Sequence, residues 1–242
     1  MSIDLEKHLL EEHDRSPFST YLKEIIYGGN DGIVTTFAVV AGFTGAAAQV
    51  SNLPLATVLL FGFANLAADG VSMSLGNFLS TNSEKDIYRT IKEKERGEIK
   101  KNPHFETEES IQILIKKGFS PNQAKNLVEI YKTNESYWLD FMMEKELQIP
   151  NPENEHPLYM AFATLLSFVG FGLIPLLPYV FFPGSPNLFT YSVGATLLAL
   201  ILLGLLRWKV TRQHWLRTIT ETLALGSIAA LVAYVVGTMF RV

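Results

Sequence analysis

The sequence contains no cysteine among its 242 residues. This absence excludes disulfide bonds and any metal site built on thiolate ligands. An excess of positive charge is also missing, since the net charge is -4 and the isoelectric point is near 5.8. We therefore do not expect the chain to bind nucleic acid, whose recognition usually requires a basic surface.

Charged residues are absent from three long stretches of the chain. No Asp, Glu, Lys or Arg occurs in residues 32–68, 157–206 or 222–240. A helix needs about 20 mainly apolar residues to cross the hydrocarbon core of a bilayer. The first stretch holds one such helix and most of a second, with a break at QVSNLP, where Asn52 and Pro54 favour a turn. The second stretch holds two helices, with a break at FPGSPN, and the third holds one. The five predicted spans are residues 29–49, 54–80, 157–181, 187–206 and 219–240.

The basic residues indicate how these helices are oriented in the membrane. All 20 Lys and Arg residues except Arg241 lie in residues 1–28, 82–156 or 207–217. Basic residues accumulate on the cytosolic side of membrane proteins. We expect these three segments to be cytosolic and the C-terminus to lie on the far side. The membrane itself, plasma or inner membrane or vacuolar membrane, depends on the organism.

Residues 82–156 form a polar insert with a helical pattern. The segment SEKDIYRTIKEKERGEIKKN continues the second span without a helix breaker until Asn102 and Pro103. Three further helices are expected in ETEESIQILIKKGF, SPNQAKNLVEIYKTN and ESYWLDFMMEKELQI, with Ser120 as an N-cap. The predicted fold class is an all-α membrane protein, with five transmembrane helices and a cytosolic helical domain inserted between helices 2 and 3. The predicted domains are residues 1–28, 29–81, 82–156 and 157–242.

Acidic and thioether side chains recur at helical spacing in this insert. They are Glu95, Glu98, Glu106, Glu109, Met142, Met143 and Glu146. Residues three or four apart share one face of a helix, so helices packed together can gather these groups around divalent metal ions. A thioether among carboxylates mildly favours later transition metals over Mg²⁺ or Ca²⁺. Glu-rich surfaces and buried methionines are also common without metal, so spacing alone leaves both interpretations open.

Two carboxylates lie at or inside the predicted membrane spans. Asp69 is within the second span, with Asn65 and Met73 four residues away on the same face. Acidic residues are expensive in lipid, and the default interpretation of such a residue is functional. Asp31 begins a polar face of the first span, and Glu24 lies two turns earlier. The alternatives are an N-cap role for Asp31 and a helix–helix hydrogen bond for Asp69.

Four segments resemble the vacuolar iron transporter family. They are NDGIVTTFAVVAGFTGA, ADGVSMSLGNFLS, WLDFMMEKELQI and GFGLIPLLPY, and the resemblance covers about residues 18–240. It implies a homodimer of five-helix subunits that exchanges cytosolic Fe²⁺, and often other divalent metals such as Mn²⁺, Zn²⁺, Co²⁺ or Ni²⁺, for protons. No enzymatic activity and no prosthetic group are implied.

The resemblance also assigns roles to residues. It implies a path between the two copies of the first span, lined by Asp31 and Met73, with Glu24 in a position where members often have an acid. It implies that the seven acidic and thioether residues of the insert form the cytosolic metal site. One departure is Asn77, in SMSLGNF, where many members have an acid. Two alternatives remain open: a manganese exporter on the same scaffold, and a membrane-tethered metal sensor or store that does not transport.

Overall fold

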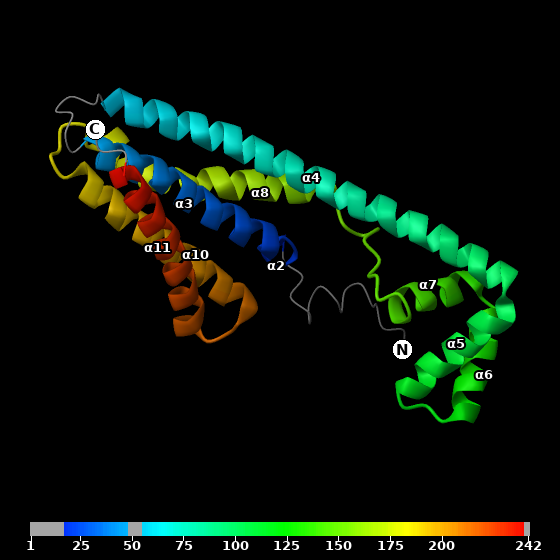
Figure 1. Cartoon of the computed structure of the whole chain (residues 1–242). Coiled ribbons are helices and arrows are strands. Elements are labelled where there is room, and N and C mark those ends of the chain that lie inside the picture. The colour runs from blue at the N-terminus through cyan, green and yellow to red at the C-terminus, as the bar shows by residue number, and fades with distance from the viewer. Residues whose placement is uncertain (1–16, 48–54, 240–242) are drawn as a thin grey trace, which may run out of the picture. The chain divides into compact units, whose positions relative to one another are not determined.

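The computed structural model describes residues 17–47 and 55–239, and the regular structure within these ranges is helical (Figure 1). The predicted turn at Asn52 and Pro54 lies outside the described residues, as does most of the N-terminal segment. In chain order the elements are α2 (Pro17–Thr20), α3 (Leu22–Ala47), α4 (Leu55–Lys101), α5 (Pro103–Lys116), α6 (Pro121–Lys132), α7 (Glu135–Lys145), α8 (Pro157–Gly172), the 3₁₀ turn η1 (Ile174–Leu176), α9 (Leu177–Phe181), α10 (Leu188–Thr211) and α11 (Trp215–Met239).

The chain divides into two compact units. Unit 1 comprises residues 1–78 and 158–242, and unit 2 comprises residues 79–157. The helix α4 contributes its first part to unit 1 and its second part to unit 2. This continuous helix confirms the prediction that the second span runs on without a break until Asn102 and Pro103.

In the described part of the chain, four helical segments are long and apolar enough to cross a membrane. They are Leu55–Lys101, Pro157–Phe181, Leu188–Thr211 and Trp215–Val236. These segments correspond to the second to fifth predicted spans. The first predicted span lies in α3, which is not among them, because Glu24, Asn30 and Asp31 make its first half polar. Four of the five spans are therefore supported by length and composition, and a membrane-spanning α3 stays a prediction.

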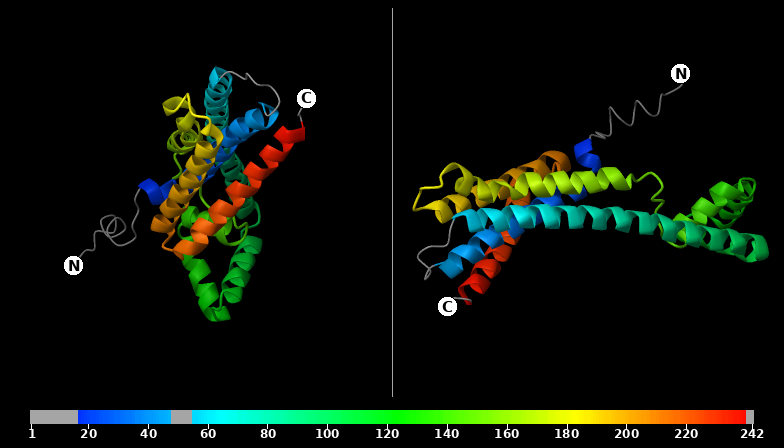
Figure 2. Two further views of the ribbon diagram at one scale, coloured as in Figure 1. Left: turned by 90° about the vertical axis from the view of Figure 1, so that its left-hand side faces the viewer. Right: turned by 90° about the horizontal axis from the view of Figure 1, so that it is seen from above.

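Within unit 1, α3 packs against α10 and α11, and Figure 2 shows these three helices side by side. On this side of α3 the buried core contains Ile33, Ala199, Leu200 and Leu203. Further along α3, Val40 belongs to a second core cluster together with Phe168 of α8, and this cluster also includes residues of α4 and α9. Apolar residues therefore pack α3 against its neighbours at two levels along the helix, although its sequence is interrupted by polar groups.

Glycines bring α3 into direct backbone contact with α8. A Cβ atom at Gly28 would lie 2.7 Å from the carbonyl oxygen of Thr164, and one at Gly32 would lie 2.2 Å from that of Phe168. A Cβ at Gly172 would lie 2.8 Å from the carbonyl oxygen of Gly32. Any larger side chain at these positions requires the two helices to separate.

Unit 2 consists of the second part of α4 and the helices α5, α6 and α7. The predicted N-cap at Ser120 is confirmed, because its hydroxyl accepts a hydrogen bond from the backbone N–H of Gln123 in a complete capping box. Ile99, Trp138, Leu139 and Met142 form a buried core beneath these helices. A bidentate ion pair connects the segment that follows α7 to α4. The guanidinium nitrogens of Arg89 lie 2.8 and 3.0 Å from the two carboxylate oxygens of Glu153.

Candidate metal sites

Unit 2 brings five carboxylates together from three helices. They form two overlapping groups in which the carboxylate oxygens lie within 4.8 Å of one another. The first group contains Glu95, Glu98 and Glu106, and the second contains Glu106, Glu109 and Glu146. We call these five residues the acidic cluster. All five were predicted from the sequence as metal ligands.

Local chain geometry explains why these residues meet. Glu95 and Glu98 share a face near the end of α4, and α5 begins directly after Asn102, so its first two turns lie next to that face. Glu106 and Glu109 occupy those turns of α5. Glu146 is the C-cap residue of α7. The short connection at Asn102 is what converts two separate i,i+3 pairs into one cluster.

The cluster is acidic, buried and incompletely satisfied. Glu95 is 3% exposed and Glu106 is 4% exposed. The Oε1 atom of Glu95 and the Oε2 atom of Glu146 are buried and have no hydrogen-bond partner among the described residues. Buried carboxylate oxygens without partners are unfavourable in a metal-free protein. A divalent cation would coordinate these oxygen atoms. The residues present therefore fit a divalent metal ion that is bound by oxygen ligands.

Burial and mutual repulsion hold protons on this cluster near neutral pH. Burial first, and then the neighbouring carboxylates Glu146, Glu106 and Glu98, raise the pKa of Glu95 to about 8. The pKa of Glu146 rises to about 7 for the same reasons, with Glu109 as its strongest carboxylate neighbour. The pKa of Glu106 is also raised, mainly by burial. A bound cation reverses this balance, because it favours the ionised form of every carboxylate around it.

The two predicted methionine ligands lie in the core of unit 2. Met142 is fully buried in the cluster of apolar side chains around Trp138, and its Sδ atom lies 3.1 Å from the Ser110 hydroxyl oxygen. That hydroxyl also lies 2.8 Å from the carbonyl oxygen of Glu106, which is the stronger acceptor for its one proton. Ser110 in turn accepts a hydrogen bond from the indole N–H of Trp138 at 2.7 Å. Met143 is 1% exposed. Packing accounts for both positions, and their role as metal ligands stays a prediction.

In unit 1, α3 and α4 bring two carboxylates near each other. Asp31 and Asp69 are both partly buried, and they lie close enough for their charges to interact. The N-cap interpretation of Asp31 is wrong, because α3 begins at Leu22 and Asp31 lies in its interior. Met73 packs against the core of unit 1, and Glu24 is 4% exposed in the first turn of α3.

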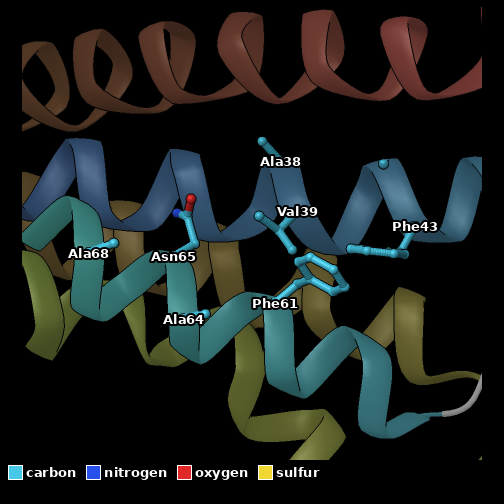
Figure 3. A pocket seen from close by; sticks show the side chains of 8 residues that line it. Ala38, Val39, Phe43, Phe61, Ala64, Asn65 and Ala68 are labelled. Carbon is cyan, nitrogen blue, oxygen red and sulfur yellow. The ribbon is translucent and has the colours of Figure 1, made fainter.

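A hollow of about 500 Å³ lies between α3 and α4 in unit 1 (Figure 3). Its walls are mostly small or aromatic side chains, and Asn65 points from α4 toward α3. The Nδ2 atom of Asn65 is buried, and residues 17–47 and 55–239 offer it no hydrogen-bond partner. Asn65 was placed on the Asp69 face by its spacing, but the hollow was not foreseen, because it depends on how α3 packs against α4.

Asn77, which stands where an acid was expected, links two helices of unit 1. Its Nδ2 atom donates a hydrogen bond to the Thr164 hydroxyl of α8 at 2.9 Å. One turn earlier, the Ser74 hydroxyl donates to the carbonyl oxygen of Ala161 at 2.9 Å. These contacts could not be predicted from the sequence, because hydrogen bonds between helices far apart in the chain leave no local pattern.

The apolar helices and the gathered carboxylates define an all-helical membrane protein with acidic sites suited to divalent cations. The sequence matches the model of the VIT family over residues 22–238. The chain therefore belongs to the VIT family, as its sequence motifs predicted.

Several relatives are similar over nearly the whole chain. Vacuolar iron transporter 1 of Arabidopsis thaliana is 36% identical over 237 residues, which cover 97% of this chain and 93% of the relative. Vacuolar iron transporter 1 of Tulipa gesneriana is 34% identical over 230 residues, covering 94% and 91%. The vacuolar iron transporter of Plasmodium berghei is 33% identical over 247 residues, covering 98% and 88%.

Proposed function

We propose that this protein carries Fe²⁺ across a membrane, out of the cytosol, in exchange for protons moving the opposite way. The observation that carries the proposal is the pair of carboxylates, Asp31 and Asp69, on neighbouring helices of unit 1. Acidic residues inside an apolar helical unit mark ion pathways in membrane proteins. Relatives named as iron transporters over nearly the full chain support iron as the cargo.

In this proposal the path runs along α3 and α4, and Asp31, Asp69, Met73 and Glu24 line it. Two copies of the chain form a homodimer, with α3 of each copy at the path. The acidic cluster of unit 2 faces the cytosol and collects the metal before transport. The C-terminus lies on the far side of the membrane, and no prosthetic group takes part.

Counterflow in sealed proteoliposomes tests the proposal. Purified protein is reconstituted with an acidic interior, and Fe²⁺ entry and proton exit are followed together by fluorescent dyes. We expect wild type to couple the two fluxes, and Asp31→Asn to lower Fe²⁺ flux by about 100-fold or more, because it removes a charge that only the passing ion compensates. Asp86→Asn, an exposed residue of α4 in unit 2, should transport like wild type.

Other outcomes favour the alternatives. Manganese is the second candidate cargo, because the acidic cluster is rich in the oxygen ligands that Mn²⁺ prefers. Faster Mn²⁺ flux than Fe²⁺ flux under one pH gradient would favour a manganese exporter. Metal binding without any flux of metal or protons would favour a membrane-tethered sensor or store.

A further inference from the structure

A polar hollow of about 730 Å³ lies beside the acidic cluster, entirely within unit 2. It is bounded by α5 and by residues at the end of α7. Glu109 and Glu146 line it and also belong to the second group of the acidic cluster. A single water occupies roughly 30 Å³, whereas small-molecule sites span roughly 300–1,000 Å³. The hollow is therefore the size of a small-molecule site and not of a single ion.

Lysines line the same hollow as these carboxylates. They are Lys116, Lys117 and Lys145. Lys145 pairs with Glu144, whereas neither Lys116 nor Lys117 forms an ion pair within the described part of the chain. Both lie at the end of α5, where positive charge is favourable. The three lysines share the hollow with three carboxylates, those of Glu108, Glu109 and Glu146, and the last two belong to the acidic cluster. Ammonium groups repel a bare divalent cation, so their location at a helix end does not explain why they lie beside a metal site.

An anion bound next to the metal would offset the repulsion between the lysine ammonium groups and the divalent cation. The second group offers three carboxylates, so a six-coordinate divalent ion keeps open positions that an oxyanion can fill. Such an anion also pairs with ammonium groups through charge-assisted hydrogen bonds. The side-chain amides of Gln112 and Gln148, which line the hollow, add neutral hydrogen-bond donors.

We propose that this hollow binds a small anion with two or more carboxylate or phosphate groups, which coordinates the metal at Glu109 and Glu146 and pairs with Lys116 and Lys117. The cluster then takes up its metal together with a chelating anion. This inference rests on the proposed function only in requiring that the acidic cluster binds metal.

Equilibrium dialysis of the full-length protein in detergent tests the proposal. Radiolabelled citrate and radiolabelled pyrophosphate are the two probes, each with and without Mn²⁺. We expect wild type to retain at least one of them, and only when Mn²⁺ is present. Retention of citrate identifies a carboxylate ligand, and retention of pyrophosphate identifies a phosphate ligand. The double variant Lys116→Ala/Lys117→Ala should lose about tenfold or more in anion affinity, because two charge-assisted contacts are removed.

Two controls separate this effect from a loss of structure. Lys125→Ala removes an exposed lysine of α6 outside the hollow and should bind the anion like wild type. The double variant should bind Mn²⁺ without anion at least as tightly as wild type, because two repelling charges are gone. Anion retention that needs no Mn²⁺, no retention at all, or unchanged retention by the double variant would overturn the inference. If Mn²⁺ binds but the anion does not, only the anion site is refuted and the proposed metal site stands. If Mn²⁺ does not bind at all, the proposed metal site and the anion site are both refuted.

Discussion

Glu95 carries a carboxyl group that is almost fully buried among other carboxyl groups. Its residue type and its spacing from Glu98 are visible in the sequence. Its burial is not, because Lys94 and Arg96 on either side give it the appearance of a solvated helix surface. Only the packing of α5 and α7 against α4 changes an ordinary acidic residue into one that retains a proton near neutral pH.

The raised pKa values predict that metal binding weakens as the pH falls. Below a pKa of about 8 for Glu95 and about 7 for Glu146, each carboxyl carries a proton that the metal must displace. We expect the affinity for Mn²⁺ to rise on the order of 100-fold between pH 6 and pH 8, since a required deprotonation contributes up to tenfold per pH unit. Titration of the full-length protein with Mn²⁺, followed by electron paramagnetic resonance, measures this.

A variant of the same residue provides the control. Glu95→Gln removes the group that titrates at the higher pH, so it should bind Mn²⁺ more weakly and with a shallower pH dependence. An affinity that is flat between pH 6 and pH 8 in wild type would show that these carboxyls are not ligands.

At the scale of elements, α3 depends on glycine for its position. Gly32 follows Asp31 in the NDG motif. Because Gly32 has no side chain, α3 can approach α8 closely at this position. We expect Gly32→Ala to destabilise the protein, lowering its apparent melting temperature by several degrees, because a Cβ would lie 2.2 Å from the Phe168 carbonyl oxygen. The measurement is thermal unfolding of the detergent-solubilised protein.

Gly76 offers a matched comparison in α4. A Cβ there meets no atom within 4 Å. Gly76→Ala should therefore leave stability unchanged or slightly raised, since alanine favours helix over glycine. Equal effects of the two substitutions would contradict the proposed contact between α3 and α8.

A second pair of glycines, one after the end of α5 and one inside α4, tests the role of backbone conformation at the end of α5. Gly118 has a φ of +101°, and its N–H donates to the carbonyl oxygen of Ile115 at 2.9 Å, which terminates the helix. Gly118→Ala should destabilise unit 2 by about 1 kcal/mol, because an L-residue is strained there. Gly97→Ala, in the interior of α4 with open space around it, should stabilise by up to about 1 kcal/mol. Chemical denaturation, followed by the fluorescence of Trp138 in unit 2, measures the free energy of unfolding of each variant. A Gly118→Ala variant as stable as wild type would refute the role assigned to its backbone.

At the scale of the whole molecule, the open question is whether α3 spans the membrane. The absence of cysteine permits a direct test, because each introduced cysteine is the only reactive thiol. Lys23 lies in the first turn of α3, Lys125 lies in unit 2, and Gly184 lies between α9 and α10. If α3 and α4 both span, cysteines at positions 23 and 125 face the same side and one at position 184 faces the opposite side.

Labelling of intact and permeabilised cells with a membrane-impermeant maleimide shows on which side of the membrane each introduced cysteine lies. We expect Gly184→Cys to react in intact cells, and Lys23→Cys and Lys125→Cys to react only after permeabilisation. Reaction of Lys23→Cys in intact cells would show that α3 does not span. Reaction of Lys125→Cys in intact cells would invert the predicted orientation.

The sequence by itself determined the helices and the residues that could bind a metal ion. Charge-free runs, helix breakers and i,i+3 spacing act over a few residues, so they predicted α4 to α7, the apolar segments and every member of the acidic cluster. Tertiary structure decided the rest: the proximity of Asp31 and Asp69, the burial of Glu95, the Asn77–Thr164 bond and the hollow beside Lys116. These features depend on contacts between residues far apart in the chain, and such contacts form only when apolar surfaces and glycine-lined helices pack.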